Sequence, residues 1–191
     1  LAVGSTGSHG ATRDFMRAVA RLPLGAVVLP GYDADLPQAV WDGLDVRAED
    51  VLVLKNIGPK AAAMPEAGYL PIPKKLAAQG VKDMVRVSDG RMSGTAFGTI
   101  VLHVTPEAAI GGPLAWVQTG DRIRLSVRER CIEWLVSDEE LAMRQNAKPV
   151  QVPAAERGYA HLFKKTVLQA DRGADFDFLT ATQRKGSIPR S

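Results

Sequence analysis

A strand–loop–strand pattern between residues 84 and 104 constrains the fold of this chain most strongly. Residues 84–87 are MVRV, in which apolar and polar side chains alternate as in a β-strand. The next segment, SDGRMSGT at 88–95, has two glycines and three hydroxyl residues in eight positions. A second apolar segment, 99–104, follows at once, and we expect it to be a strand. The chain must therefore turn sharply between two strands.

Small hydroxyl residues between glycines have two interpretations. They allow a tight turn that brings backbone N–H groups and a side-chain oxygen close to a ligand. They are also common in Gly/Ser-rich turns that only connect strands. Local chemistry leaves both open, and no histidine precedes Ser93 closely enough in sequence to indicate a catalytic triad.

In the rest of the chain, the pattern of apolar and polar residues predicts many short strands and few helices. Ser137 and Glu140 form a capping-box pattern at the start of one helix. Because strands and helices do not alternate regularly, the pattern favours an α+β, β-rich fold, a barrel or sandwich edged by helices. The expected strands are 26–29, 51–55, 114–117 and the hairpin 122–127 with 132–136; the expected helices are 36–44, 71–79, 137–144 and 159–170.

Length and composition indicate one globular domain. The 191 residues are 46% hydrophobic and 24% charged, with a net charge of +3. No block of five like charges occurs and the apolar runs are short, so we expect no nucleic acid or membrane partner. We divide the chain into a lead-in with a short helix (1–22), a β-barrel-like domain with the loop (23–150), and a C-terminal helix and tail (151–191). A start at Leu1 without Met suggests a fragment, and residues 1–10 are interpreted as a flexible lead-in or a severed connection. No signal-peptide pattern opens the sequence, and we expect a cytoplasmic location.

The single cysteine limits the redox chemistry that this chain can support alone. Cys131 excludes an internal disulfide and fits a reducing compartment. One thiolate also cannot hold an iron–sulfur cluster or a Cys-rich zinc site. We expect Cys131 to be a core residue.

The central loop and the segment after it resemble a known family. SDGRMSGTAFG at 88–98, followed by LHVTPEAAIGGPLAWVQTGDRIRL at 102–125, is similar to the C-terminal signature of the dihydroxy-acid dehydratase/6-phosphogluconate dehydratase family. The resemblance implies a swivelling β/β/α barrel-like domain, an architecture that aconitase-type enzymes share.

The resemblance also implies roles for individual residues. In the family, the glutamate of a Met-Pro-Glu motif is a ligand of Mg²⁺, and here that residue is Glu66, 27 positions before Ser93. Ser93 matches the general base, and Gly94 and Thr95 match substrate-binding positions. Without the resemblance, Glu66 is interpreted as a surface carboxylate and Thr95 as a strand-entry residue. The loop before Glu66 also has fewer glycines than in relatives.

The implied reaction is dehydration of a 2,3-dihydroxy acid to a 2-keto-3-deoxy acid. The implied cofactors are Mg²⁺ and an iron–sulfur cluster, expected as [2Fe–2S], which act as Lewis acids. The cysteines and most magnesium ligands are expected from a missing N-terminal domain. The chain alone is therefore expected to be inactive, and the full-length enzyme is expected to be a homo-oligomer.

The tail favours a sugar acid as substrate. RGYAHLFKKTVLQADRGADFDFL at 157–179 resembles pentonate and hexonate dehydratases, in which a terminal histidine follows a Pro-Arg segment. Here the chain stops at Ser191 without that histidine. The alternatives are a dihydroxy-acid dehydratase of branched-chain amino acid synthesis, a non-catalytic β-barrel ligand-binding domain, and an aconitase-like swivelling subunit. We expect structural roles for two residues of the segment LHVTPEA: His103 as a hydrogen-bonded core histidine, and Glu107 at the start of a helical turn.

Overall fold

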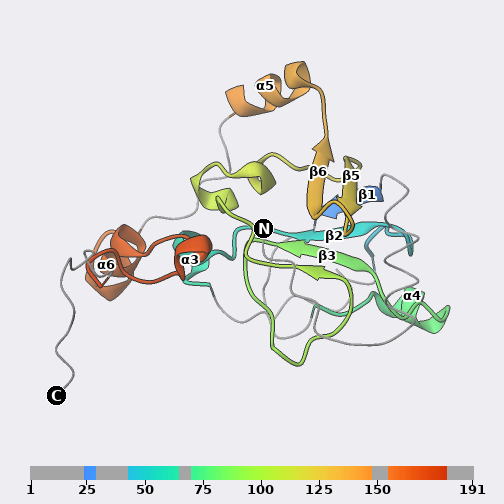
Figure 1. Ribbon diagram of the computed structural model, residues 1–191, viewed down its shortest axis with the longest axis horizontal. Helices are drawn as coiled ribbons and strands as arrows, with labels where there is room; N and C mark the ends of the chain where they lie inside the picture. Colours follow the sequence, from blue (N-terminus) through green and yellow to red (C-terminus); the bar gives the residue numbers. More distant parts are fainter. Residues whose placement is uncertain (1–23, 29–42, 65–69, 148–154, 180–191) are drawn as a thin grey trace.

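A six-stranded mixed sheet forms the centre of the molecule (Figure 1). The computed structural model describes residues 24–28, 43–64, 70–147 and 155–179, so the short helix expected within 1–22 and most of the expected helix 36–44 lie outside the described residues. The strands lie in the order β4-β3-β2-β1-β5-β6. Their bounds are β1 Leu24–Val28, β2 Val51–Leu54, β3 Val85–Ser88, β4 Ile100–Val101, β5 Arg122–Ser126 and β6 Cys131–Leu135.

Strands β1 to β4 are parallel to one another. All four residues of β2 and of β3 are buried, which explains why the VLVL segment of β2 is continuously apolar. β4 is shorter than the expected strand 99–104, because His103 has a left-handed backbone (φ 58°) that ends the extended conformation. The parallel pairing was not predicted from the sequence.

The predicted hairpin is confirmed. β5 and β6 are antiparallel, with Ile123 opposite Trp134 and Leu125 opposite Ile132. β5 is also antiparallel to β1, so the hairpin extends the parallel strands into a mixed sheet. Among the described strands, β4 and β6 are edges and the sheet does not close into a barrel. The α+β prediction is therefore compatible with the structure, whereas the barrel-like description is not confirmed.

The core has two parts, one on each face of the sheet. Val51, Val53, Val85 and Val87 pack in one cluster, because alternate residues of a strand point to the same face. Leu52 and Leu54 belong to the other cluster. The first cluster also contains Leu114, Ile123 and Leu125, and the second also contains Leu70, Leu76, Met84 and Met92.

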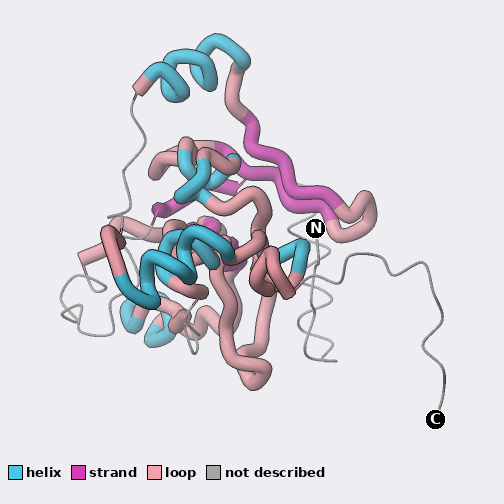
Figure 2. Tube along the Cα trace, turned by 90° about the vertical axis from the view of Figure 1, so that its left-hand side faces the viewer, coloured by secondary structure: helices cyan, strands magenta, loops and turns pink. Residues whose placement is uncertain are grey.

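Short helices surround the sheet (Figure 2). The N-cap half of the predicted capping box is confirmed, since the Glu140 N–H donates to Ser137 Oγ (3.2 Å), whereas the Glu140 carboxylate pairs with Arg144 (2.7 Å). The predicted strand at 114–117 was wrong. The chain forms a 3₁₀ turn there, and Gly112 approaches the Pro106 carbonyl so closely that a Cβ would lie 1.7 Å from its oxygen. The helices are α3 Pro59–Ala62, α4 Lys74–Ala78, α5 Asp138–Asn146 and α6 Gly158–Thr166; the 3₁₀ turns are η1 Ala108–Ile110, η2 Pro113–Ala115 and η3 Ala170–Arg172. Within the described ranges, each helix is too short or too polar to cross a membrane.

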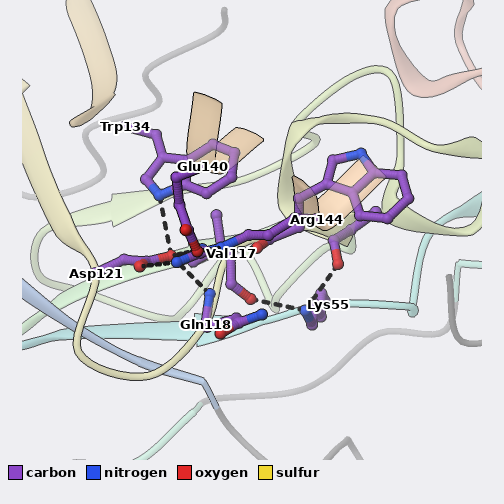
Figure 3. Close-up of polar contacts among 9 residues, drawn as sticks. Lys55, Val117, Gln118, Asp121, Trp134, Glu140 and Arg144 are labelled. Atoms are coloured by element: carbon purple, nitrogen blue, oxygen red, sulfur yellow. Dashed lines mark hydrogen bonds and ion pairs between the residues drawn. The ribbon is translucent and has the colours of Figure 1, made fainter. Parts of the chain in front are cut away.

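Helix α5 has no buried residue and is attached by ion pairing (Figures 1 and 3). Arg144 donates to both carboxylate oxygens of Asp121 (2.6 and 3.0 Å), and the Trp134 indole N–H donates to the same carboxylate (3.0 Å). Burial alone would raise the pKa of Asp121, but the hydrogen bonds from Arg144, the Gln118 N–H and Trp134 outweigh it and hold that pKa below its ordinary value. Beside this group, Lys55 Nζ donates to the carbonyls of Ala115 and Val117 (3.2 and 2.9 Å).

Candidate functional site

Two buried carboxylates organise the loops at the carboxyl edge of the parallel strands. Asp89, directly after β3, accepts hydrogen bonds from the N–H groups of Asn56, Ile57 and Ala108 (3.0–3.1 Å). It thereby joins the loop after β2 to the segment after β4. Burial raises the pKa of Asp89, although these backbone hydrogen bonds act in the opposite direction.

Glu107 is the second buried carboxylate. It precedes η1, as the expected helical turn requires. Its carboxylate accepts hydrogen bonds from the N–H groups of Lys60 and Ala61 (2.8 and 3.0 Å), which lie in the first turn of α3 and have no acceptor within the helix. Gln169 donates to the same carboxylate (2.6 Å) and accepts the Glu107 N–H (2.9 Å). Glu107 therefore fixes both α3 and the tail after α6, which the sequence did not indicate.

Ser93 and Thr95 lie together in the loop after β3. Their hydroxyl oxygens are 2.9 Å apart, and the Thr95 backbone N–H also donates to Ser93 Oγ (N to O distance 3.3 Å). Ser93 is half-buried, and Gly94 and Thr95 are exposed. A Cβ at Gly94 would meet open space, whereas one at Gly90 would lie 2.3 Å from the Ile57 side chain. The tight packing of this loop thus depends on Gly90 rather than on Gly94.

Arg91 links this loop to the segment that leads to Glu66. Its Nε donates to the Met64 carbonyl (3.1 Å). Ala63 and Met64 both have left-handed backbones (φ 59° and 52°), which non-glycine residues rarely adopt. Glu66 itself lies outside the described residues, and its role as a magnesium ligand stays a prediction.

A pocket of about 450 Å³ lies between α3, α6 and the loops after β3 and β4. Figure 1 shows α3 beside α6, and these helices are in contact. Of the described residues, Ser93 and Thr95 do not line the pocket, although Met64 and Arg91 do. The lining also includes Pro59, His103, Phe163 and Gly173.

His103 lies at this pocket, and the expectation of a core histidine was wrong. Its side chain is exposed, because the chain leaves β4 at Val101 and turns through the left-handed conformation at His103. Desolvation of the part of the imidazole that the protein covers, together with the positive charge of Arg91, lowers its pKa. The histidine within the apolar segment 99–104 was the sequence signal for this site. The apolar pattern did not indicate that the strand ends before His103, so the sequence did not predict an exposed side chain there.

The described residues do not by themselves fit a complete metal or cluster site. Within them, no group of three or more His, Cys, Asp or Glu side chains could hold a metal ion. Cys131 is half-buried on β6 rather than fully buried, and it is the single cysteine of the chain. Magnesium or an iron–sulfur cluster would need further ligands from elsewhere.

The family model and the curated relatives that match this chain all point to one family of dehydratases. The model of the dihydroxy-acid/6-phosphogluconate dehydratase C-terminal domain matches residues 21–174. The chain is 52% identical over 139 residues (72% of the chain, 24% of the relative) to a 6-deoxy-6-sulfo-D-gluconate dehydratase of Pseudomonas putida. It is 49% identical over 171 residues (86% and 29%) to an L-arabonate dehydratase of Azospirillum brasilense.

A dihydroxy-acid dehydratase of Thermus thermophilus is 37% identical over 132 residues (68% of the chain, 23% of the relative). The chain thus spans about a quarter of the length of these curated relatives. Since the family model covers most of the chain, this protein belongs to the dihydroxy-acid/6-phosphogluconate dehydratase family and corresponds to its C-terminal domain.

Proposed function

We propose that this chain is the C-terminal part of a hydro-lyase that dehydrates a sugar acid, with Ser93 as the general base. The observation that carries the proposal is the hydroxyl pair of Ser93 and Thr95, in a loop that lies within the residues matched by the family model. Abstraction of the C2 proton requires Ser93 as an alkoxide. The Thr95 hydroxyl and N–H group both lie close enough to donate to Ser93 Oγ, and such donors stabilise a negatively charged oxygen.

We also propose the two cofactors, Mg²⁺ and an iron–sulfur cluster, for which the described residues alone do not provide a complete site. When bound, Mg²⁺ would stabilise charge on the substrate and an iron–sulfur cluster, expected as [2Fe–2S], would take the leaving hydroxyl. Within this chain we propose Glu66 as a magnesium ligand. The cluster and the other ligands would come from an N-terminal domain, because the chain has one cysteine. A reducing compartment such as the cytoplasm fits this cysteine content.

We propose a sugar acid rather than a branched-chain dihydroxy acid as the substrate. The relatives named for sugar acids are about 50% identical to this chain, and the dihydroxy-acid dehydratase of Thermus thermophilus is 37% identical. A site that pairs substrate hydroxyl groups rejects an analogue that lacks them by a large factor. The test is the kcat/KM of the full-length enzyme for arabinonate, xylonate, gluconate and 2,3-dihydroxyisovalerate. Preference for 2,3-dihydroxyisovalerate would favour the alternative function in branched-chain amino acid synthesis.

The role of Ser93 is tested by Ser93→Ala in the full-length enzyme. Loss of a general base lowers turnover about 10²–10⁴-fold, so we expect kcat to fall at least about 10²-fold while the fold is retained. Ser137→Ala is the matched control, because it also removes one hydroxyl but lies at the start of α5. If Ser93→Ala keeps more than a few per cent of kcat, Ser93 is not the base.

A further inference from the structure

We propose that the pocket between α3 and α6 binds the hydroxylated tail of the acid, the carbons beyond C3, and that His103 and Arg91 are its polar recognition residues. This inference rests on the proposed function and assigns a binding site and specificity residues to it. The pocket volume of about 450 Å³ suits a small, chain-like molecule.

The position of the pocket in the fold supports a ligand site. Pro59 follows β2, Arg91 follows β3 and His103 follows β4, and these three strands are parallel neighbours. Three consecutive loops at the carboxyl edge of a parallel sheet therefore form one side of the pocket. In open sheets of this kind, ligands bind beyond the carboxyl ends of the strands.

The pocket also lies next to the proposed chemistry. Arg91 lines it and stands two residues before Ser93, the proposed base. Two residues of extended chain span at most about 7 Å. An acid whose first carbons lie near Ser93 would thus have its remaining carbons within reach of the pocket.

The side chains in the pocket match a polyol. A neutral imidazole offers one donor and one acceptor, and a hydroxyl group needs both. The Arg91 guanidinium has its orientation fixed by the hydrogen bond from Nε to the Met64 carbonyl. On the other side, Phe163 and Gly173 provide an apolar wall suited to the C–H groups of a sugar chain.

The backbone at His103 is held in an uncommon conformation. Its φ is 58°, its N–H donates to the Gly90 carbonyl (3.1 Å), and its carbonyl accepts the Thr105 hydroxyl (2.9 Å). Non-glycine residues kept in this region cost energy and are concentrated at ligand sites. Here the two hydrogen bonds fix the direction in which the imidazole leaves the loop.

The test uses His103→Gly in the full-length enzyme, since glycine adopts a positive φ without strain. The variant is assayed with long acids, arabinonate and gluconate, and with glycerate and 2,3-dihydroxyisovalerate, which lack a hydroxylated tail. Short acids that are not turned over are compared as competitive inhibitors. We expect KM for the long acids to rise about three- to tenfold, the contribution of one hydrogen bond. We expect kcat, and the KM or Ki of the short acids, to change less than twofold.

Two further variants keep the test specific. His103→Asn retains a donor, an acceptor and tolerance of positive φ, so it should recover part of the lost affinity for long acids. His161→Asn is the control, because His161 lies on α6 outside the pocket lining and should leave all constants unchanged. Equal losses for long and short acids, or a fall in kcat alone, would overturn the tail-binding role. A wild-type enzyme that dehydrates none of these acids would instead refute the proposed function.

Discussion

Replacement of Glu107 should destabilise the fold more than replacement of any exposed glutamate. The side chain is 1% exposed, and its carboxylate accepts hydrogen bonds from Lys60 N, Ala61 N and Gln169 Nε2. Glu107→Ala leaves these donors without their acceptor. The N–H of Ala61 is buried, so water cannot replace the lost bond there, whereas Lys60 is only half-buried.

The magnitude follows from these contacts. A buried donor that loses its acceptor costs about 1–3 kcal/mol, and hydrogen bonds to a charged group lie at the upper end. With one fully buried and two partly buried donors, we expect Glu107→Ala to lower the free energy of unfolding by about 3–5 kcal/mol. Glu107→Gln keeps the shape and one acceptor oxygen, so we expect about half of that loss.

Urea unfolding of the 191-residue chain, followed by tryptophan fluorescence, measures both variants. With a slope of about 2 kcal/mol per molar urea, Glu107→Ala should lower the midpoint by about 1.5–2.5 M. Glu133→Ala is the control, because Glu133 is exposed and pairs with Arg124 on the hairpin, a pair worth about 0–1 kcal/mol. A Glu107→Ala shift no larger than the control would refute the idea that this carboxylate holds α3. If the alanine variant is unfolded without urea, the glutamine variant supplies the magnitude.

Three other predictions follow from the site and the α5 attachment. The pKa of Asp121 is lowered in the folded state, so the stabilisation by its carboxylate is present above its ordinary pKa of 3.8 and is lost as pH falls through the lowered value. In urea titrations, the difference in the free energy of unfolding between wild type and Asp121→Asn should therefore shrink below about pH 4. In the full-length enzyme, Glu66→Gln should raise the Mg²⁺ concentration that gives half-maximal binding, measured by calorimetry, because a neutral amide is a weaker ligand than a carboxylate; an unchanged titration would make Glu66 a surface residue. The 191-residue chain, reconstituted with iron and sulfide, should show no visible iron–sulfur absorbance, and a brown protein would contradict the expectation that the cluster belongs to another domain.

Local patterns in the sequence were sufficient for several elements. The alternation of Ile123 and Leu125 with charged residues predicted a hairpin strand, because residues of one face of a sheet recur every second position. The Ser137 and Glu140 pair predicted the start of α5, since a helix cap depends only on residues three positions apart. The motif around Ser93 was sufficient for the family, which the comparison confirmed.

The pairing of strands and the position of the pocket depended on the tertiary structure. Parallel pairing of β1 to β4 joins segments far apart in the chain, and no local pattern of Val51–Leu54 encodes which neighbour it takes. The apolar run 99–104 suggested one strand and a core histidine, but the turn at His103 is fixed by a hydrogen bond to Gly90, a contact between segments. Glu107 and Gln169 are 62 residues apart, so their reciprocal hydrogen bonds exist only after the sheet has brought the tail to its carboxyl edge. The sequence determined which residues are capable of chemistry, and the packing of distant segments decided which of them share a pocket.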